Sequence, residues 1–259
     1  MEAGKVALVT GAGSGIGRAA ARRLSRDGFA VAALGRNRQE ILAVARELTE
    51  EGASAFDVVA DISIDEEMRL AVSQVAERFG RLDVVVANAG INGTWAPIED
   101  LQPHEWDQTM AVNLRGTYLT LHHSVPYLKA AGGGSVVVIS SINGTRTFTT
   151  PGATAYSATK AGQMAMVQQL ALELARHKIR INAVCPGEID TNINDNTALR
   201  GEDETAIPVI WPEGQVPITG GRPGRAEDVA DVIAFLAGEG ARHITGTPIW
   251  VDGGQGLLR

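Results

Sequence analysis

The sequence of 259 residues predicts an α/β protein: one Rossmann-type domain with a doubly wound parallel sheet of about seven strands and helices on both faces. Short runs rich in β-branched residues recur along the chain and alternate with longer stretches of helical period. The runs are almost entirely apolar, which is typical of strands that are covered on both faces. No Ser- or Pro-rich linker divides the chain, so we expect a single domain over residues 1–259.

The predicted strands are apolar runs that end at or beside turn residues: VALVT (6–10), VAAL (31–34), FDVVAD (56–61), LDVVVANAG (82–90), SVVVIS (135–140), IRINAVCPG (179–187) and PIWVDGG (248–254). The predicted helices are longer stretches in which apolar residues recur at helical spacing: 16–26, 39–51, 65–79, 105–128, 155–177 and 226–236. Strands that alternate with helices imply parallel pairing with right-handed crossovers. The order of these elements therefore predicts the doubly wound sheet.

One segment, residues 191–225, departs from this alternation. It is polar and rich in Pro and Gly, and it is longer than an ordinary loop of a compact domain. Loops of this length are usually functional or mobile, so we predict a flexible lid over about 191–225.

Composition narrows the class of partner. The net charge of −7 argues against a nucleic-acid partner held by phosphate contacts. No run of about 18 apolar residues is present, and the first residues lack a basic start followed by a long apolar core, so we expect neither membrane insertion nor secretion. The single cysteine excludes an internal disulfide framework and favours the cytoplasm, and the five histidines show no metal-binding pattern.

A glycine cluster lies between the first predicted strand and the first predicted helix. It does not match G-x-G-x-x-G, because the sixth place counted from Gly11 is Ile16, and no Gly-Lys-Ser/Thr follows as in a P-loop. At this position a backbone without side chains can approach a pyrophosphate, and the helix N-terminus offers free N–H groups. The alternative is a tight strand–helix turn without a ligand.

Read as Thr10-Gly11-x-x-x-Gly15-x-Gly17, the cluster resembles the variant found in short-chain dehydrogenases/reductases. Further motifs of that family occur in the same order over nearly the whole chain. They are Asp61-Ile62, Asn88-Ala89-Gly90, Asn113 in VNL, Ser141, Tyr156-x-x-x-Lys160, Pro186-Gly187-x-Ile189-x-Thr191 and the closing ITGTPIWVDGG. The resemblance implies hydride transfer between a nicotinamide and a carbonyl or secondary alcohol, and a homotetramer or homodimer built on the helices that contain Asn113 and Tyr156.

Tyr156 and Lys160 are four residues apart on a predicted helix and therefore share a face. A nearby ammonium favours the phenolate and is expected to lower the pKa of Tyr156, which would act as general acid or base. The alternative is a buried tyrosine that packs under a surface lysine. The resemblance implies that Ser141 holds the substrate oxygen and that Asn113 holds a water linking Lys160 to solvent; alternatively, Asn113 and Asn88 satisfy backbone groups.

The family's serine commonly lies 13 residues before the tyrosine, and that place is Asn143 here. Gly144, three residues after Ser141, matches a glycine of the family and identifies Ser141, with Ser140 as the alternative. The segment 145–153 is then two residues longer than usual. Trp95 and Trp211 fall in segments that border the substrate in this family, although either could pack in a core.

The resemblance assigns the cofactor to Gly11, Ser14, Gly15, Ile16, Gly17, Arg36, Asp61, Ile62, Asn88, Ala89, Gly90, Tyr156, Lys160, Pro186, Gly187, Ile189 and Thr191, the last holding the nicotinamide carboxamide. Gly35 stands where an acid would select NAD(H), and Arg36 follows it, which favours NADP(H) because a guanidinium suits a 2′-phosphate. Ser14 is a counter-indication, since many NADP-dependent relatives carry a basic residue there. Asp61 could equally cap the following helix.

The sequence thus predicts an NAD(P)(H)-dependent oxidoreductase for a small carbonyl or alcohol substrate. The alternatives are an NAD-dependent sugar or polyol dehydrogenase on the same fold and a nucleotide-binding sensor without turnover. Cys185, beside Pro186, is expected to lie near the nicotinamide as a buried and inert thiol.

Overall fold

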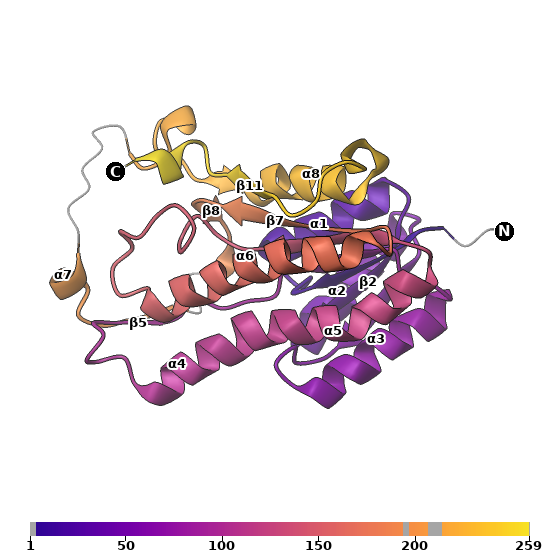
Figure 1. Cartoon of the computed structure of the whole chain (residues 1–259), viewed down its shortest axis with the longest axis horizontal. Coiled ribbons are helices and arrows are strands. Elements are labelled where there is room, and N and C mark those ends of the chain that lie inside the picture. Colours follow the sequence, from indigo (N-terminus) through magenta and orange to yellow (C-terminus); the bar gives the residue numbers. More distant parts are fainter. Residues whose placement is uncertain (1–3, 194–196, 207–213, 259) are drawn as a thin grey trace.

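The computed structural model describes residues 4–193, 197–206 and 214–258 (Figure 1). Its centre is a seven-stranded parallel sheet in the order β11-β7-β6-β4-β1-β2-β3, which confirms the predicted fold class. The strands are β1 (Val6–Thr10), β2 (Ala30–Gly35), β3 (Ala55–Val59), β4 (Val84–Ala87), β6 (Gly134–Ile139), β7 (Ile179–Pro186) and β11 (Pro248–Val251). β4 is shorter than predicted because the chain leaves the sheet at Asn88 to pack on the glycine cluster.

The helices that flank the sheet are α1 (Gly15–Arg26), α2 (Arg38–Glu50), α3 (Asp65–Phe79), α4 (Pro103–Thr109), α5 (Gly116–Ala130), α6 (Thr154–Ala175) and α8 (Ala226–Ala237). The single helix predicted over 105–128 is interrupted: α4 and α5 are joined by a π-helical turn, η1 (Met110–Arg115), which contains Asn113. Short 3₁₀ turns follow at η3 (Pro217–Thr219), η4 (Glu239–Ala241) and η5 (Gln255–Leu257).

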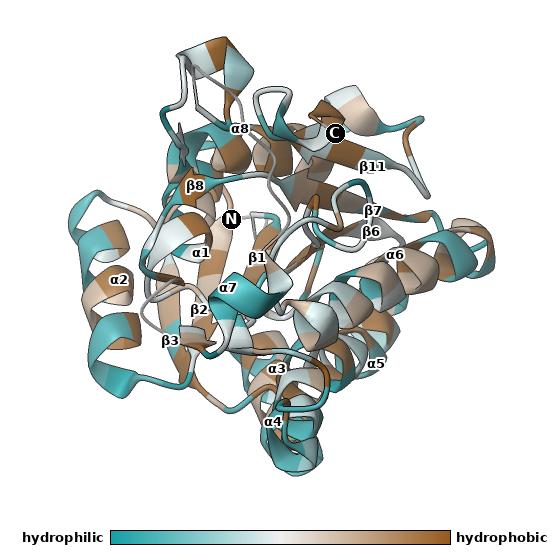
Figure 2. Ribbon diagram, turned by 90° about the vertical axis from the view of Figure 1, so that its left-hand side faces the viewer, coloured by the Kyte–Doolittle hydropathy of each residue, from teal (hydrophilic) through white to brown (hydrophobic). Residues whose placement is uncertain are grey.

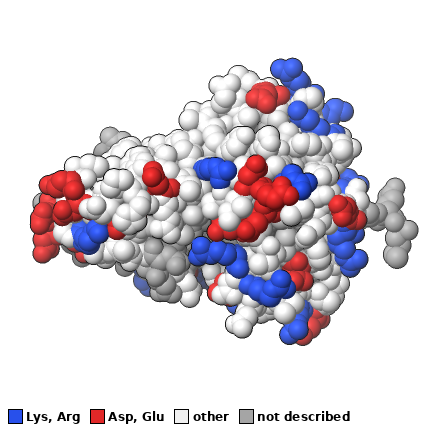
Figure 3. All heavy atoms as spheres, turned by 90° about the horizontal axis from the view of Figure 1, so that it is seen from below, with Lys and Arg blue, Asp and Glu red and all other residues white. Residues whose placement is uncertain are grey.

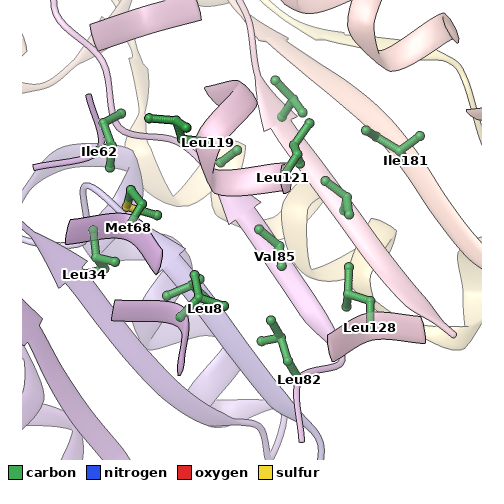
Figure 4. Packing of buried hydrophobic residues seen from close by; sticks show 14 of the residues in the cluster. Leu8, Leu34, Ile62, Met68, Leu82, Val85, Leu119, Leu121, Leu128 and Ile181 are labelled. Atoms are coloured by element: carbon green, nitrogen blue, oxygen red, sulfur yellow. The ribbon is translucent and has the colours of Figure 1, made fainter. Parts of the chain in front are cut away.

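Two hydrophobic layers hold the helices to the sheet. On one face, α3, α5 and α6 pack through residues such as Met68, Leu119 and Leu128 against Leu8 and Val85 (Figure 4). On the other face, α1, α2 and α8 cover the alternate residues of the same strands. Figure 2 shows brown strands between helices whose outer sides are largely teal. Each fully buried leucine in these layers contributes about 2 kcal/mol to stability.

Parallel pairing brings the carboxyl ends of all seven strands to one edge of the sheet. α1, which follows β1, lies on one face, whereas the chain after β4 leads to helices on the other face. The point where β1 pairs with β4 is therefore the topological switch point, where ligands of open α/β sheets bind. The segments that follow β1, β4, β6 and β7 meet at this edge.

The predicted lid contains short elements at this edge: β9 (Thr197–Leu199), α7 (Glu202–Thr205) and β10 (Gly224–Arg225), and β8 (Ile189–Asp190) directly precedes it. β9 pairs with β5 (Gly93–Trp95), and β10 pairs with β8, so the segment is tied down at two places. Residues 194–196 and 207–213 of the predicted lid, with Trp211, lie outside the described residues.

Acidic and basic side chains are interspersed over the face of the molecule in Figure 3, and an acidic group gathers at the end where α7 lies. Over the described ranges, every helix is too short or too polar to cross a membrane. Those ranges also hold no group of three or more His, Cys, Asp or Glu side chains with metal-binding geometry.

Candidate active site

A cavity of about 730 Å³ opens at the carboxyl edge of the sheet. Many of the residues that the sequence singled out line it, from segments far apart in the chain. These are Ile16, Asn88, Gly90, Ser140, Ser141, Tyr156, Lys160, Pro186, Gly187, Ile189 and Thr191. The fold therefore brings Ile16 of the glycine cluster to the same cavity as Ser141, Tyr156 and Lys160.

Tyr156 and Lys160 lie on the first turns of α6, and both side chains are buried. The Lys160 Nζ atom is 5.4 Å from the centre of the Tyr156 ring and donates a 2.9 Å hydrogen bond to the Ile139 carbonyl at the end of β6. Because Lys160 is only 4% exposed, the alternative of a tyrosine packed under a surface lysine is wrong.

Ser141 follows β6 and is buried beside Tyr156, to which it is hydrogen bonded. Its Oγ also accepts a 3.1 Å bond from the Asn143 backbone N–H, which fixes the start of the loop. The Ser140 hydroxyl instead donates to the Lys160 backbone carbonyl at 3.0 Å. The geometry therefore favours Ser141 over Ser140 as the partner of the Tyr156 hydroxyl.

Asn113 is fully buried in the π-helical turn, beneath the cavity and outside its lining. Its side chain exchanges two 2.8 Å hydrogen bonds with the backbone of Ile91 and donates a third to Thr159 Oγ1 at 3.2 Å. Its own carbonyl accepts from Thr117 Oγ1 (2.7 Å) and Gln163 Nε2 (2.9 Å). The Asn113 side chain thus satisfies backbone groups, as in the alternative interpretation. Its backbone carbonyl oxygen already accepts two hydrogen bonds.

The glycine cluster is close-packed. A Cβ at Gly17 would lie 2.1 Å from the Gly11 carbonyl oxygen, and Gly11 itself has a φ of 66° and touches Ala89. The Asn88 side chain donates to the carbonyls of Thr10 and Gly11, so Asn88 too satisfies backbone groups. Larger side chains at Gly11 and Gly17 would therefore clash with the neighbouring backbone.

This loop fits the phosphates of a dinucleotide. α1 begins at Gly15, and the Ser14 side chain does not cap it, so its first N–H groups are available to an anion. A Cβ at Gly15 would contact Thr191 at 3.2 Å, which brings the residue predicted to hold the nicotinamide carboxamide next to the pyrophosphate end. Any bulkier residues here would fill the space that a dinucleotide needs.

The predicted adenosine end lies at the ends of β2 and β3. Arg36 is 76% exposed, and its Nη1 is 3.8 Å from Asp61 Oδ2. Asp61 accepts two bonds from Ser63, one from the backbone N–H (2.9 Å) and one from the hydroxyl (2.7 Å), which stabilise the turn before α3; the N-cap of α3 itself is Ile64, so Asp61 does not cap the helix. Burial opposes ionisation, but the Ser63 bonds and the Arg36 charge hold the pKa of Asp61 below its usual value. The Ile62 side chain packs in the core against Gly116.

Comparison with known proteins agrees with this geometry. The family model for short chain dehydrogenases matches residues 5–200. The chain belongs to the short-chain dehydrogenase family. It is 35% identical to the 3-oxoacyl-acyl-carrier-protein reductase FabG of Thermotoga maritima over 97% of both chains.

Two solved structures of short-chain dehydrogenases are also similar. A 3-ketoacyl-ACP reductase from Sinorhizobium meliloti 1021 is 68% identical, with a TM-score of 0.96 over 98% of this chain and all of that chain. A 3-ketoacyl-(acyl-carrier-protein) reductase from Brucella melitensis in complex with NADH is 33% identical, with a TM-score of 0.86 over 98% of both chains. As a short-chain dehydrogenase, this protein is an NAD(P)-dependent oxidoreductase that interconverts carbonyl and alcohol groups, as the sequence predicted.

The titration of the central pair in this short-chain dehydrogenase differs from the expectation. Burial raises the pKa of Tyr156, and the hydrogen bond to Ser141 only partly opposes it. Burial also lowers the pKa of Lys160 to about 8, because an ammonium is poorly solvated there. The protein's own groups therefore move the pKa of Tyr156 upward, so the expected direction is wrong. At neutral pH Tyr156 is a phenol that can donate a proton.

Cys185 is fully buried on β7, and burial raises its thiol pKa to about 11. This confirms the prediction of an inert thiol. Trp95 lines the cavity, with its ring centre 6.2 Å from that of Tyr156.

Several residues that shape the cavity were not among the predicted site residues. Gln255 and Leu258, near the end of the chain, line it beside Glu188 and the long loop after β6. Arg146 of that loop stacks 3.7 Å from the centre of the Trp250 ring and approaches Asp252 at 3.8 Å, so the loop is fastened to the C-terminal turn. Gln255 and Leu258 lie outside the motifs of the sequence analysis, and only the fold brings Arg146 together with Trp250 and Asp252 of the closing motif.

Proposed function

We propose that this short-chain dehydrogenase works as a carbonyl reductase that prefers NADPH to NADH, with Tyr156 as the proton donor. The observation that carries the proposal is the buried Tyr156 phenol in the cavity, with a raised pKa, bonded to Ser141 and backed by Lys160. A phenol that stays protonated at neutral pH is suited to protonating a carbonyl oxygen.

A reduced nicotinamide, when bound, supplies a hydride to the carbonyl carbon. Ser141 would donate a hydrogen bond to the carbonyl oxygen and hold it against Tyr156. The Tyr156 hydroxyl would then give its proton to that oxygen, which completes the alcohol and leaves a phenolate. The Lys160 ammonium, 5.4 Å from the Tyr156 ring, would stabilise this phenolate, because both side chains are buried and poorly screened by water. Asn113 would fix the turn beneath them through its bonds to Ile91.

The cofactor would lie along the glycine cluster, over Asn88-Ala89-Gly90 and against Pro186, Gly187, Ile189 and Thr191. These residues converge on the cavity, and the uncapped α1 N-terminus supports an anionic ligand. Arg36, exposed at the end of β2, supports a 2′-phosphate and hence NADP(H).

The remaining expectations are part of this proposal. Residues 191–225 would act as the substrate lid, which the pairing of β9 with β5 beside the cavity supports. The protein would form a homotetramer or homodimer through α5 and α6, on which Tyr118 and Leu172 are 49% and 84% exposed. The single buried thiol and the lack of a spanning helix among the described residues support a cytoplasmic enzyme.

A second candidate is the sugar or polyol dehydrogenase. The cavity wall near Tyr156 carries several polar side chains, among them Asn92, Asn143, Glu188 and Gln255, which suit a substrate with several hydroxyl groups. A sensor without turnover is less well supported, because it would have no need of two buried titratable groups at the cavity.

The test combines binding with turnover. Thermal unfolding of the purified protein is followed while NADPH and NADH are titrated separately, and oxidation of NADPH is then followed with a panel of ketones. We expect stabilisation by NADPH at lower concentration than by NADH, and turnover that is lost in Tyr156→Phe while the thermal shift persists. Preference for NADH together with polyol oxidation would favour the second candidate, and turnover by Tyr156→Phe would contradict the role of the tyrosine.

A further inference from the structure

The end of β2 has no room for the acid that dinucleotide-binding folds commonly place there to hold the ribose 2′-hydroxyl. Gly35 is the last residue of β2, and a Cβ at Gly35 would lie 2.7 Å from Cδ1 of Ile41. Ile41 is a core residue of α2 and is 1% exposed. An Asp or Glu at position 35 would therefore collide with the core, and a carboxylate could reach the ribose only from another position.

Glu40, the residue before Ile41, brings a carboxylate back to the glycine cluster. A Cβ added to Gly13 would lie 2.6 Å from Glu40 Oε2 and 2.9 Å from Glu40 Cβ, so the side chain lies directly against the loop. Asn37 Nδ2 donates a 2.7 Å hydrogen bond to Oε1 and fixes the carboxylate in this position. Glu40 is exposed, so its carboxylate is accessible to a ligand that lies on the glycine cluster at Gly13.

The charges around this position are balanced. Arg36 and Arg38 are cations at the end of β2 and the start of α2, while Glu40 and Asp61 are the carboxylates. A ribose with a free 2′-hydroxyl can donate a hydrogen bond to a carboxylate. A 2′-phosphate carries almost two negative charges and is repelled by the same carboxylate. The Asn37 bond leaves Oε2 of Glu40 as the free acceptor at Gly13.

We infer that Glu40 is a specificity-determining residue for the cofactor. It accepts a hydrogen bond from the 2′-hydroxyl of NADH and weakens the binding of the 2′-phosphate of NADPH, so that the preference due to Arg36 is smaller than the arginine alone would give. The inference rests on the proposed binding of a nicotinamide dinucleotide along the glycine cluster.

The experiment compares Glu40→Gln with Glu50→Gln, which removes the same charge from the same helix ten residues away, about 15 Å along the axis. Dissociation constants of NADPH and NADH are measured by calorimetry for the wild type and both variants. Adenosine 2′,5′-bisphosphate and adenosine 5′-monophosphate are titrated as well, because they report on the ribose end without the nicotinamide.

In Glu40→Gln we expect NADPH and the bisphosphate to bind about tenfold more tightly, and NADH about threefold more weakly, since a neutral amide no longer repels phosphate. In Glu50→Gln all four constants should stay within about twofold of the wild type. The gain for NADPH should shrink as the salt concentration rises, because the carboxylate is exposed.

An NADPH-to-NADH ratio in Glu40→Gln that equals the ratio in Glu50→Gln would overturn the role of Glu40 and leave the proposed function intact. Failure of the wild type to bind either dinucleotide would overturn both. Because Glu40 is exposed, the ligand-free variants should unfold at the wild-type temperature, which separates an effect on the site from an effect on folding.

Discussion

Replacement of Lys160 by Met tests whether the central lysine is held at a cost to stability. Burial lowers the pKa of Lys160 from 10.5 to about 8, so the unfolded chain binds more protons than the folded protein between these values. Stability attributable to Lys160 therefore rises with pH through this window. The lowered pKa corresponds to about 3 kcal/mol of lost folding stability below pH 8. About 2 kcal/mol of this stability is recovered between pH 7 and pH 9.5.

We expect the free energy of unfolding of the wild type, minus that of Lys160→Met, to increase by about 2 kcal/mol over this range. The variant also loses the bond to the Ile139 carbonyl, but that loss does not depend on pH and cancels in the comparison. Urea unfolding of the ligand-free proteins at pH 7 and 9.5, at one protein concentration, gives the four values required. The upper limit of pH 9.5 lies below the usual tyrosine pKa of 10.0, and burial raises the pKa of Tyr156 in the folded protein, so most of Tyr156 stays protonated.

Lys129→Met is the matched control, because Lys129 is exposed at the end of α5. Its difference from the wild type should be the same at both pH values. If the difference in unfolding free energy between the wild type and Lys160→Met changes by less than about 0.5 kcal/mol between the two pH values, burial does not destabilise the Lys160 ammonium. That result would refute the reasoning from its burial.

Three further predictions concern the walls of the cavity. Gly17→Ala should weaken both dinucleotides by at least about tenfold in calorimetry, because its Cβ would meet the Gly11 carbonyl at 2.1 Å and force the loop to move; affinity within twofold of the wild type would contradict this. Arg146→Ala should raise the KM of the carbonyl substrate about tenfold while the cofactor affinity is kept, since the loop after β6 loses its contact with Trp250; an unchanged KM would show that the loop holds without it. With cofactor saturating, kcat/KM for an anionic ketone of the panel should rise with salt and in Glu188→Gln, because this exposed carboxylate at the cavity repels it; a fall with salt would indicate attraction.

The comparison of relatives leaves the substrate open, and the shape of the cavity explains why. Tyr156 and Lys160 are held by α6 and β6, whereas the walls come from the loop after β6, the segment after β7 and the C-terminal turn. A change in these walls can therefore alter which compounds fit without moving Tyr156 and Lys160. The two-residue extension around Arg146 is one such difference predicted for this chain.

Local patterns in the sequence were enough to predict the sheet, the order of its elements along the chain and the candidate site residues. Apolar runs and helical periods depend on local burial, and motifs such as Tyr156-x-x-x-Lys160 depend on fixed spacing along one helix, so both are visible in one dimension. The glycine cluster is likewise a local turn whose packing on Asn88 follows from the neighbouring strand.

The pKa shifts and the long-range contacts could be found only in the folded structure. The pKa of Tyr156 rises and that of Lys160 falls because burial depends on everything packed around them, which no spacing reveals. Three contacts join residues that are far apart in the sequence. Asn113 bonds to Ile91, 22 positions away, and Arg146 stacks on Trp250, 104 positions away. The Glu40 side chain of α2 contacts Gly13 in the glycine cluster. Such contacts are set by the way the layers pack, and the energies of burial and of charge in the site follow from them.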